Sequence, residues 1–294
     1  MTVSAAPFPV DGSDFDAFDT AGIAAKADRE NFPVALRVLP AGIRAHLKAI
    51  YAYARLIDDL GDRHVGDRLA MLDRADAELT RAFAGSSVHR IFADIVETVR
   101  AIGASRGPLD DLLAANRLDQ RKARYSSYEE LEAYCALSAN PVGRLVLGVL
   151  GVSDAHSIAL SDRICTGLQL VEHLQDIGED ARDGRIYFPR PDLDRFGVGL
   201  SDLLGTDASP GVRRLVAFES ARARALLDGG LPLVTRVHGA GRLALAGFVG
   251  GGLAQLDEIE KRQFDVLSRL AKAPKRTVLR RAAAIALRAR LRAR

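Results

Sequence analysis

The sequence predicts an all-α protein with a single domain. From about residue 28 onward, almost every long segment repeats apolar residues at i, i+3, i+4 and i+7, which is the period of an amphipathic helix. No segment shows the alternation of polar and apolar residues that would indicate a strand. The 294-residue chain is 48% hydrophobic and 27% charged, an ordinary globular composition, and it is long enough to bury a sizeable core.

The predicted helices follow one another without a dividing linker. Pro141 falls in the middle of the fifth helix, where a proline removes a backbone hydrogen bond and bends the helix. The proline, glycine and aspartate content of residues 184–207 predicts a long loop with one short helical turn. The expected helices cover residues 43–62, 66–84, 88–103, 109–121, 128–150, 157–180, 210–227, 231–238 and 243–270.

Both ends of the chain differ in composition from the body, residues 28–273. Residues 1–27 are small, acidic and interrupted by proline and glycine, so we expect a flexible acidic leader; they lack the basic n-region of a signal peptide. Residues 275–294 hold eight of the 41 Lys and Arg and none of the 38 Asp and Glu, so the rest of the chain is net acidic. A net acidic body argues against a nucleic-acid-binding protein.

The basic C-terminal tail, residues 274–294, allows two interpretations. As a helix it would be about 30 Å long, and its arginines could hold anionic lipid at the inner face of a membrane. Alternatively, it is a solvated, partly disordered end. The longest uncharged stretch, residues 243–256, has the length of a buried core helix rather than of a membrane span. Cys135 and Cys165 give no disulfide framework, so we expect a reducing, cytoplasmic environment.

Two pairs of aspartates are the main candidate site residues: Asp58/Asp62 in RLIDDLGDR and Asp176/Asp180 in LQDIGEDARDGR. Helix residues four apart lie on one face, and Glu172 extends the second pair by one more turn. One such pair is usually a solvated helix face, but both pairs lie in apolar sequence, where carboxylates are costly without a partner. Oxygen ligands on rigid helices suit Mg²⁺ that is completed by substrate phosphates. The pattern therefore predicts two halves of a magnesium site.

Both motifs, and the GRIYFP segment after the second one, resemble the aspartate-rich regions of the squalene/phytoene synthase family. The resemblance covers roughly residues 28–270. It implies a single-domain isoprenoid-synthase helical bundle around a central pocket, with the catalytic domain at residues 28–273. The residues that it implies to be catalytic and to bind Mg²⁺ beside a diphosphate are Asp58, Asp62, Asp176 and Asp180. The family often has asparagine at the position of Glu172, but a glutamate can also bind a metal, so we expect Glu172 to be a further metal ligand.

Further side chains are expected to bind the polyprenyl diphosphate. Arg55 and Arg185 would meet phosphate oxygens through charge-assisted contacts, with a surface ion pair as the alternative for each. Gly143 would make room for a long chain, with close helix packing as its alternative. Asp119 matches an acidic position of the family's central region. The expected substrate-binding residues are Tyr51, Arg55, Tyr134, Ser138, Asn140, Gly143, Gln169, Arg185 and Tyr187.

Within this family the chain is similar to the hydroxysqualene synthase branch of hopanoid biosynthesis. Condensing members usually have Val-Ala-Gly where this chain has Ser-Ala-Asn from Ser138 to Asn140, and many have tyrosine at the position of Gly252. The similarity implies a Mg²⁺-dependent carbon–oxygen lyase that converts presqualene diphosphate and water to hydroxysqualene and diphosphate. Ser138 or Asn140 would then position the water. The segments that carry this similarity are ENFPVALRVLP at 30–40, YCALSANPVGRLVL at 134–147 and GGLAQLDEIEKRQFDVL at 251–267.

Two alternative functions stay open. The nearer one is a prenyltransferase that condenses two prenyl diphosphates head to head, as a presqualene diphosphate or phytoene synthase does. The other is a non-catalytic relative that acts as an assembly or binding module, although such a module has no reason to tolerate clustered carboxylates in apolar helices. The expected partner is a polyprenyl diphosphate, with pathway enzymes and a membrane surface as open alternatives and no nucleic acid.

Overall fold

The computed structural model describes residues 39–87, 89–268 and 272–292, and over these residues the protein is all-α, as predicted. The acidic leader and nearly all of the ENFPVALRVLP segment lie outside the described residues. The described part contains no strand, and one parallel bridge joins Arg124 to Ile186. The helices are α3 (Ala41–Asp62), α4 (Arg68–Phe83), α5 (Arg90–Ala101), α6 (Gly107–Asp119), α7 (Tyr128–Ser138), α8 (Asn140–Val149), α9 (Ala155–Arg182), α10 (Arg190–Phe196), α11 (Leu200–Leu203), α12 (Pro210–Gly230), α13 (Leu233–Arg236), α14 (Gly239–Lys261) and α15 (Lys275–Arg292).

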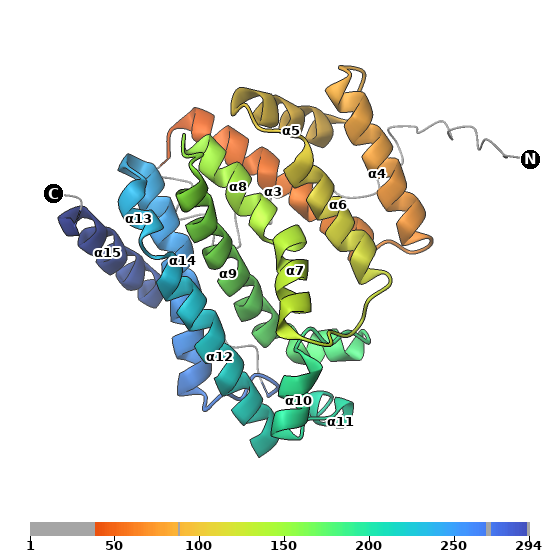
Figure 1. Cartoon of the computed structure of the whole chain (residues 1–294), viewed down its shortest axis with the longest axis vertical. Helices are drawn as coiled ribbons and strands as arrows, with labels where there is room; N and C mark the ends of the chain where they lie inside the picture. The colour runs from red at the N-terminus through yellow and green to blue at the C-terminus, as the bar shows by residue number, and fades with distance from the viewer. Residues whose placement is uncertain (1–38, 88, 269–271, 293–294) are drawn as a thin grey trace, which may run out of the picture.

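Two long helices, α3 and α9, organise a single helical bundle (Figure 1). Helix α3 packs against α4, α5 and α6, helix α9 packs against α7, α12 and α14, and α8 contacts both α3 and α9. The apolar core is divided in the same way, with one cluster around Leu56 of α3 and another around Leu170 of α9. Residues of both clusters line the apolar cavity described below, so this cavity lies between the two halves of the core.

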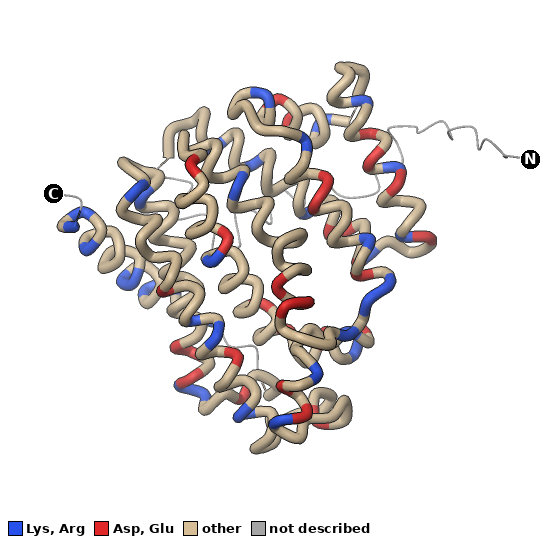
Figure 2. The backbone as a smooth tube through the Cα atoms, in the orientation of Figure 1, with Lys and Arg blue, Asp and Glu red and all other residues tan. Residues whose placement is uncertain are grey.

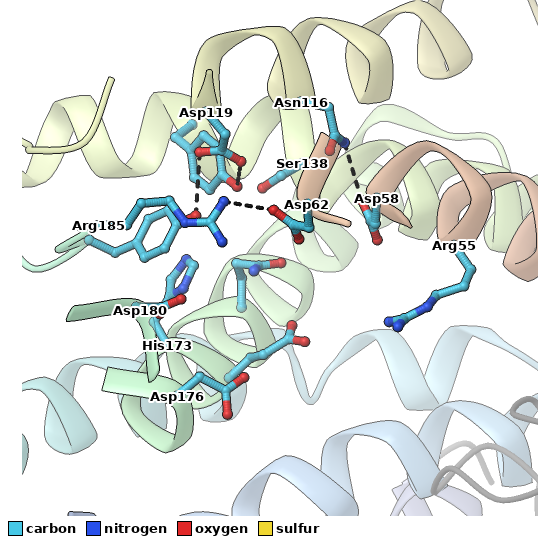
Figure 3. Close-up of a pocket in the computed structure, with 14 residues that line it drawn as sticks. Arg55, Asp58, Asp62, Asn116, Asp119, Ser138, His173, Asp176, Asp180 and Arg185 are labelled. Atoms are coloured by element: carbon cyan, nitrogen blue, oxygen red, sulfur yellow. Dashed lines mark hydrogen bonds and ion pairs between the residues drawn. The ribbon is translucent and has the colours of Figure 1, made fainter. Parts of the chain in front are cut away.

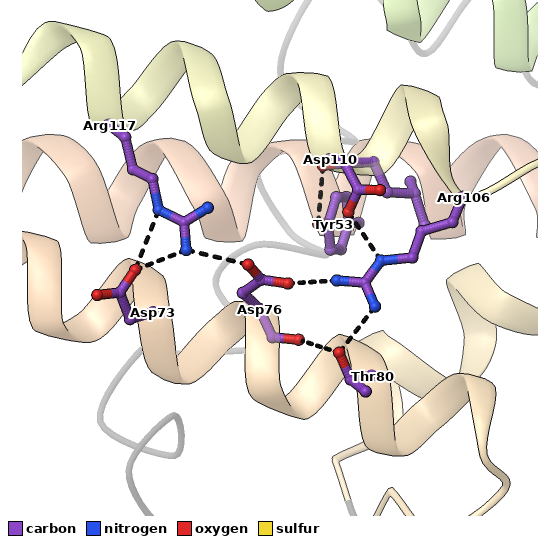
Figure 4. A network of polar contacts seen from close by, with 8 residues as sticks. Tyr53, Asp73, Asp76, Thr80, Arg106, Asp110 and Arg117 are labelled. Carbon is purple, nitrogen blue, oxygen red and sulfur yellow. Dashed lines mark hydrogen bonds and ion pairs between the residues drawn. The ribbon is translucent and has the colours of Figure 1, made fainter. Parts of the chain in front are cut away.

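Ion pairs hold α6 against α4 (Figure 4). Arg117 Nη2 lies 2.6 Å from Asp73 Oδ1 and 3.1 Å from Asp76 Oδ2. Arg106 also pairs with Asp76, and its Nε lies 2.7 Å from Asp110 Oδ1. Isolated surface pairs contribute little to stability, but a network that shares one carboxylate contributes more. The network therefore holds α6 in place, and α6 contributes residues to the acidic cavity described below.

The helices depart from the predicted pattern at three places. The fifth predicted helix is two helices, because the chain breaks at Ala139 and α8 starts again with Pro141 in its first turn. The prediction of a long loop at 184–207 was wrong in part, because this segment contains the helices α10 and α11. Both are too short to show a helical period in the sequence. Helix α14 ends at Lys261 rather than near residue 270, because Gln263 and Phe264 adopt positive φ angles of 53° and 60°.

The basic C-terminal residues form α15, which packs against α13 and α14. Gly250 of α14 permits this contact, since an added Cβ would lie 2.9 Å from the backbone nitrogen of Ala282. Arg281 of α15 also pairs with Asp257 of α14. The packed body thus continues beyond residue 273 to the end of α15. In the described part of the chain, no helix has both the length and the apolar character needed to span a bilayer.

Candidate active site

Both aspartate pairs lie in the wall of one cavity, which we call the acidic cavity (Figure 3). Asp58 and Asp62 come from the last turns of α3, and Asp176 and Asp180 come from the C-terminal part of α9. Glu172, one turn earlier on α9, lines the same cavity, as the helical spacing predicts. The remaining lining residues are Arg55, Asn116, Asp119, Tyr134, Ser138, Gln169, His173, Arg185 and Tyr187.

Burial of these carboxylates disfavours their ionised form. Burial raises the pKa of Asp58 to about 6; a hydrogen bond from Asn116 opposes the rise and the charge of Asp62 adds to it. Burial likewise raises the pKa of Asp180 to about 7, although Arg185 opposes it. Neighbouring carboxylates contribute to both shifts, so the cavity holds more negative charge than its own arginines neutralise. A bound cation would relieve this repulsion.

Asn116 of α6 holds Asp58 in position. Its Nδ2 donates to Asp58 Oδ1 at 3.1 Å and to the carbonyl oxygen of Leu112 at 3.2 Å. The amide lies against Gly61 of α3, where an added Cβ would collide with Asn116 Oδ1. Gln120 also donates to the Gly61 carbonyl oxygen at 3.0 Å. Helices α3 and α6 therefore meet at a point that has room only for glycine, and this contact orients a carboxylate of the first pair.

The arginines of the cavity have unused hydrogen-bond donors. Arg185 Nη1 pairs with Asp62 Oδ1 at 2.7 Å, and Arg55 forms a 3.1 Å ion pair within α3. The Nε atom of each arginine is buried and has no hydrogen-bond partner among the described residues, and the same is true of Ser138 Oγ and His173 Nε2. Buried polar atoms are normally hydrogen-bonded. Water or a polar ligand in the cavity would satisfy these four atoms.

Aromatic rings and one carboxylate form another part of the wall. Asp119 accepts hydrogen bonds from the hydroxyl of Tyr134 at 2.6 Å and from that of Tyr187 at 3.3 Å. The His173 ring stacks on Tyr187 with ring centroids 3.8 Å apart. Burial raises the pKa of Asp119 to about 6 and lowers that of His173 to about 3, so the imidazole is neutral near pH 7. Because the imidazole is neutral, the positive charge of this cavity comes from its arginines.

An apolar cavity adjoins the acidic one. Asp58, Ser138, Gln169 and Glu172 line both cavities, so these residues mark the junction. Gly143 lies in the apolar wall, where an added Cβ would press on the side chains of α9. The apolar cavity is otherwise lined by Ala54, Leu112, Ala139, Val142, Val146, Leu147, Ser161, Ile164, Cys165, Leu168, Leu245 and Phe248.

The carboxylates of the acidic cavity fit Mg²⁺ that is shared with a ligand. In the described part of the chain, no three His, Cys, Asp or Glu side chains come close enough to hold one ion by themselves. Mg²⁺ is usually bound through one or two carboxylates and completed by water and phosphate oxygens, rather than by a cage of protein ligands. Pairs of carboxylates on opposite walls of one cavity therefore suit magnesium bound together with a diphosphate.

Two of the predicted substrate-binding residues line neither cavity. Tyr51 is half-buried and packs against the apolar cluster around α3. Asn140 is buried, and its Oδ1 accepts a hydrogen bond from Thr166 Oγ1 at 3.2 Å. Of the two residues expected to position a water, only Ser138 lines a cavity. Asn140 instead fastens the start of α8 to α9.

Sequence reasoning did not identify Asn116 or His173 as site residues. Asn116 lies one helical turn before Asp119, so both fall on one face of α6, and this spacing is the signal that could have found it. His173 follows Glu172 directly, but a histidine inside an apolar helix gives no comparable signal.

Comparison with known proteins places this site in a family. The family model described as squalene/phytoene synthase matches residues 25–277. Hydroxysqualene synthases from Sinorhizobium fredii and Rhodopseudomonas palustris are each 37% identical to this chain, over 71% of its length and 71% of theirs. Phytoene synthase 3 from Zea mays is 31% identical over 92% of this chain, and the match spans 65% of the maize protein.

Solved structures share the same fold. The squalene synthase HpnC from Alicyclobacillus acidocaldarius has a TM-score of 0.77 at 40% identity, over 86% of this chain and 95% of that one. A ligand-bound dehydrosqualene synthase has a TM-score of 0.83 over 97% of this chain and 100% of that one; its 23% identity shows the fold alone. The helical bundle, the two aspartate pairs around one cavity and the extent of the family match agree, and the chain belongs to the squalene/phytoene synthase family.

Proposed function

We propose that this protein releases diphosphate from presqualene diphosphate with the help of Mg²⁺ and adds water to the resulting cation, giving hydroxysqualene. The observation that carries the proposal is the junction of an acidic and an apolar cavity at Asp58, Ser138, Gln169 and Glu172. A prenyl diphosphate has a charged head and a long apolar chain, so it suits a site with two such compartments. The 37% identity to hydroxysqualene synthases supports this choice of reaction.

The acidic cavity would hold the diphosphate. Mg²⁺ held by the aspartates and Glu172 would neutralise the charge of the leaving group. Arg55 and Arg185 would donate their buried Nε–H groups to phosphate oxygens, which would satisfy two atoms that have no partner within the described part of the chain. Because these donors are held in place before the reaction, they would stabilise negative charge as it develops on the leaving oxygen.

The apolar cavity would hold the cation. When the carbon–oxygen bond breaks, its electron pair leaves with the diphosphate and the cation remains between α3, α8, α9 and α14. Cys165 is the strongest potential nucleophile in this wall, but burial raises the pKa of its thiol to about 12, so it stays protonated. Ser138 Oγ, at the junction, would hold the water whose oxygen bonds to the cation and whose proton passes to the diphosphate.

Head-to-head condensation is the second candidate. The match to a maize phytoene synthase over 92% of this chain favours it, and the two cavities also suit two prenyl diphosphates that react in turn. The two reactions differ in their substrate: condensation consumes farnesyl or geranylgeranyl diphosphate, whereas the proposed reaction consumes presqualene diphosphate and water.

The test incubates the purified protein with presqualene diphosphate in ¹⁸O-labelled water, with Mg²⁺ or with EDTA, and identifies products by mass spectrometry. We expect hydroxysqualene that carries one ¹⁸O, formed only with Mg²⁺. Asp180→Asn should abolish turnover, whereas the control Asp183→Asn, at an exposed position just after α9, should not. The same assay is run with farnesyl diphosphate alone and with geranylgeranyl diphosphate alone. Turnover of either would instead assign condensation, and no turnover of any of the three substrates would favour the non-catalytic module.

A further inference from the structure

Helix α15 has apolar residues on two sides, and the described part of the chain covers only one of these sides. Ala286 and Ala289 are buried on the side that packs against the body. Leu287 and Leu291 are one turn apart, lie outside this buried stripe and are 59% and 63% exposed. Leu279 is two turns before Ala286, at the start of the stripe, and is 47% exposed. Leucines on the surface are common singly, but three on one short helix are unusual.

The uncovered face is strongly basic. Arginines surround the three leucines along the helix, and α15 contains no aspartate or glutamate (Figure 2). Arg281 is turned to the body, where it pairs with Asp257 of α14. The exposed basic residues of α15 are Lys275, Arg276, Arg280, Arg288, Arg290 and Arg292.

Helix α14 extends the apolar part of this surface. Leu243 is 49% exposed and lies two turns before Gly250, which puts both residues on the same side of α14. Gly250 contacts Ala282 of α15, so Leu243 lies on the α15 side of the bundle. We call the three leucines and six exposed basic residues of α15, together with Leu243, the α15 face.

We propose that the α15 face binds the surface of a membrane that contains anionic lipid. Basic side chains complement the negative headgroups, and the leucines can enter the boundary of the acyl layer while the arginines reach back to the phosphates. A nucleic acid would match the charge but would leave the leucines in water. A second copy of the same face would bring like charges together. A lipid surface accommodates both kinds of side chain.

The test is flotation of the full-length protein with vesicles of phosphatidylcholine alone or mixed with phosphatidylglycerol. We expect binding only to the mixed vesicles, and weaker binding at about 0.5 M salt, where surface charge is screened. Near an anionic surface each arginine increases the binding affinity about fivefold. The triple variant Arg276→Gln/Arg280→Gln/Arg288→Gln should therefore lower the affinity for the mixed vesicles by about a hundredfold. The triple variant Leu279→Ser/Leu287→Ser/Leu291→Ser should also lose binding.

The matched control is Leu200→Ser/Leu204→Ser, which changes two exposed leucines at α11, outside the α15 face, and should bind like the unaltered protein. Circular dichroism checks that every variant is folded. Absence of flotation by the unaltered protein, or flotation that both triple variants retain, would overturn the proposal. A dimer that the leucine variant dissociates, without any vesicle binding, would also overturn it by assigning the face to a second copy.

Discussion

Arg185 Nη1 lies 2.7 Å from Asp62 Oδ1, and this ion pair connects the segment after α9 to the first aspartate pair on α3. The Nε of the same guanidinium is buried and has no hydrogen-bond partner in the described ranges of the chain. It therefore balances one carboxylate while a further donor stays available at the acidic cavity. This arrangement leads to a prediction about diphosphate binding.

Replacing Arg185 with methionine should lower kcat/KM for the prenyl diphosphate about ten- to a hundredfold, the effect of losing a hydrogen bond between charged groups. Arg185→Lys should fall between this variant and the unaltered enzyme, because it keeps the charge but loses the planar set of donors. Inorganic pyrophosphate should also inhibit the methionine variant more weakly. The control is Arg190→Met, at an exposed position of α10. Equal kinetics for Arg185→Met and the control would contradict this role.

A second prediction concerns Gly61, which lies within the first aspartate motif but is not among the predicted site residues. In Gly61→Ala the added methyl group would displace the Asn116 amide, and Asp58 would lose the hydrogen bond that orients it. We expect kcat to fall about fivefold or more, the effect of one lost hydrogen bond. The matched control is Gly42→Ala on the same helix, where no atom of the described residues lies within 4 Å of the new Cβ.

The two substitutions separate local geometry from helix propensity. Alanine in place of glycine favours a helix by about 1 kcal/mol, so Gly42→Ala should raise the thermal unfolding midpoint and leave activity unchanged. Gly61→Ala gains the same propensity but meets the collision with Asn116. If both variants are fully active, the Asn116–Asp58 contact does not matter for the reaction.

These examples show which parts of the site the sequence could predict. The aspartate pairs were recognisable because their spacing alone determines that they share a helix face. The contact between Asn116 and Gly61 depends on how closely α6 approaches α3, and single-helix periodicity contains no such information. The prediction for Asn140 failed for a related reason. Because this residue is polar, we expected it to line the site, but the packing of α8 on α9 turns it toward Thr166. The long helices were therefore predictable, whereas the short helices α10 and α11 and the contacts between helices were not.

A third prediction concerns Glu219 of α12. This residue is far from the site residues along the chain, and its side chain is fully buried. Burial raises its pKa to about 8, although Arg222, whose Nη1 lies 2.7 Å away, opposes the rise. The unfolded chain has an ordinary glutamate pKa near 4.3. Between these values the folded protein binds a proton that the unfolded chain does not, so this group makes the protein less stable as pH rises.

Glu219→Gln removes this titration, so its thermal midpoint should increase relative to that of the unaltered protein between pH 5.5 and pH 8.5. Each kcal/mol corresponds to about 2–4 °C for chains of 150–250 residues, and we expect a change of this order. Thermal melts followed by circular dichroism measure it, with Glu97→Gln at an exposed position of α5 as the control. A midpoint difference that stays constant with pH would show that Glu219 is ionised throughout this range.

The last prediction separates departure of the diphosphate from capture of water. Ser138 Oγ lies at the junction of the two cavities and has no hydrogen-bond partner among the described residues. In Ser138→Ala the groups around the diphosphate are intact, so the rate of diphosphate release should change little. The cation would meet a less well positioned water and lose a proton more often, which lowers the ratio of alcohol to alkene about fivefold, the effect of one hydrogen bond. Diphosphate release and product ratio are measured on the same samples, with Ser126→Ala at an exposed position as the control. An unchanged ratio would assign water capture to another group, and a large loss of diphosphate release would instead mean that Ser138 contacts the leaving group.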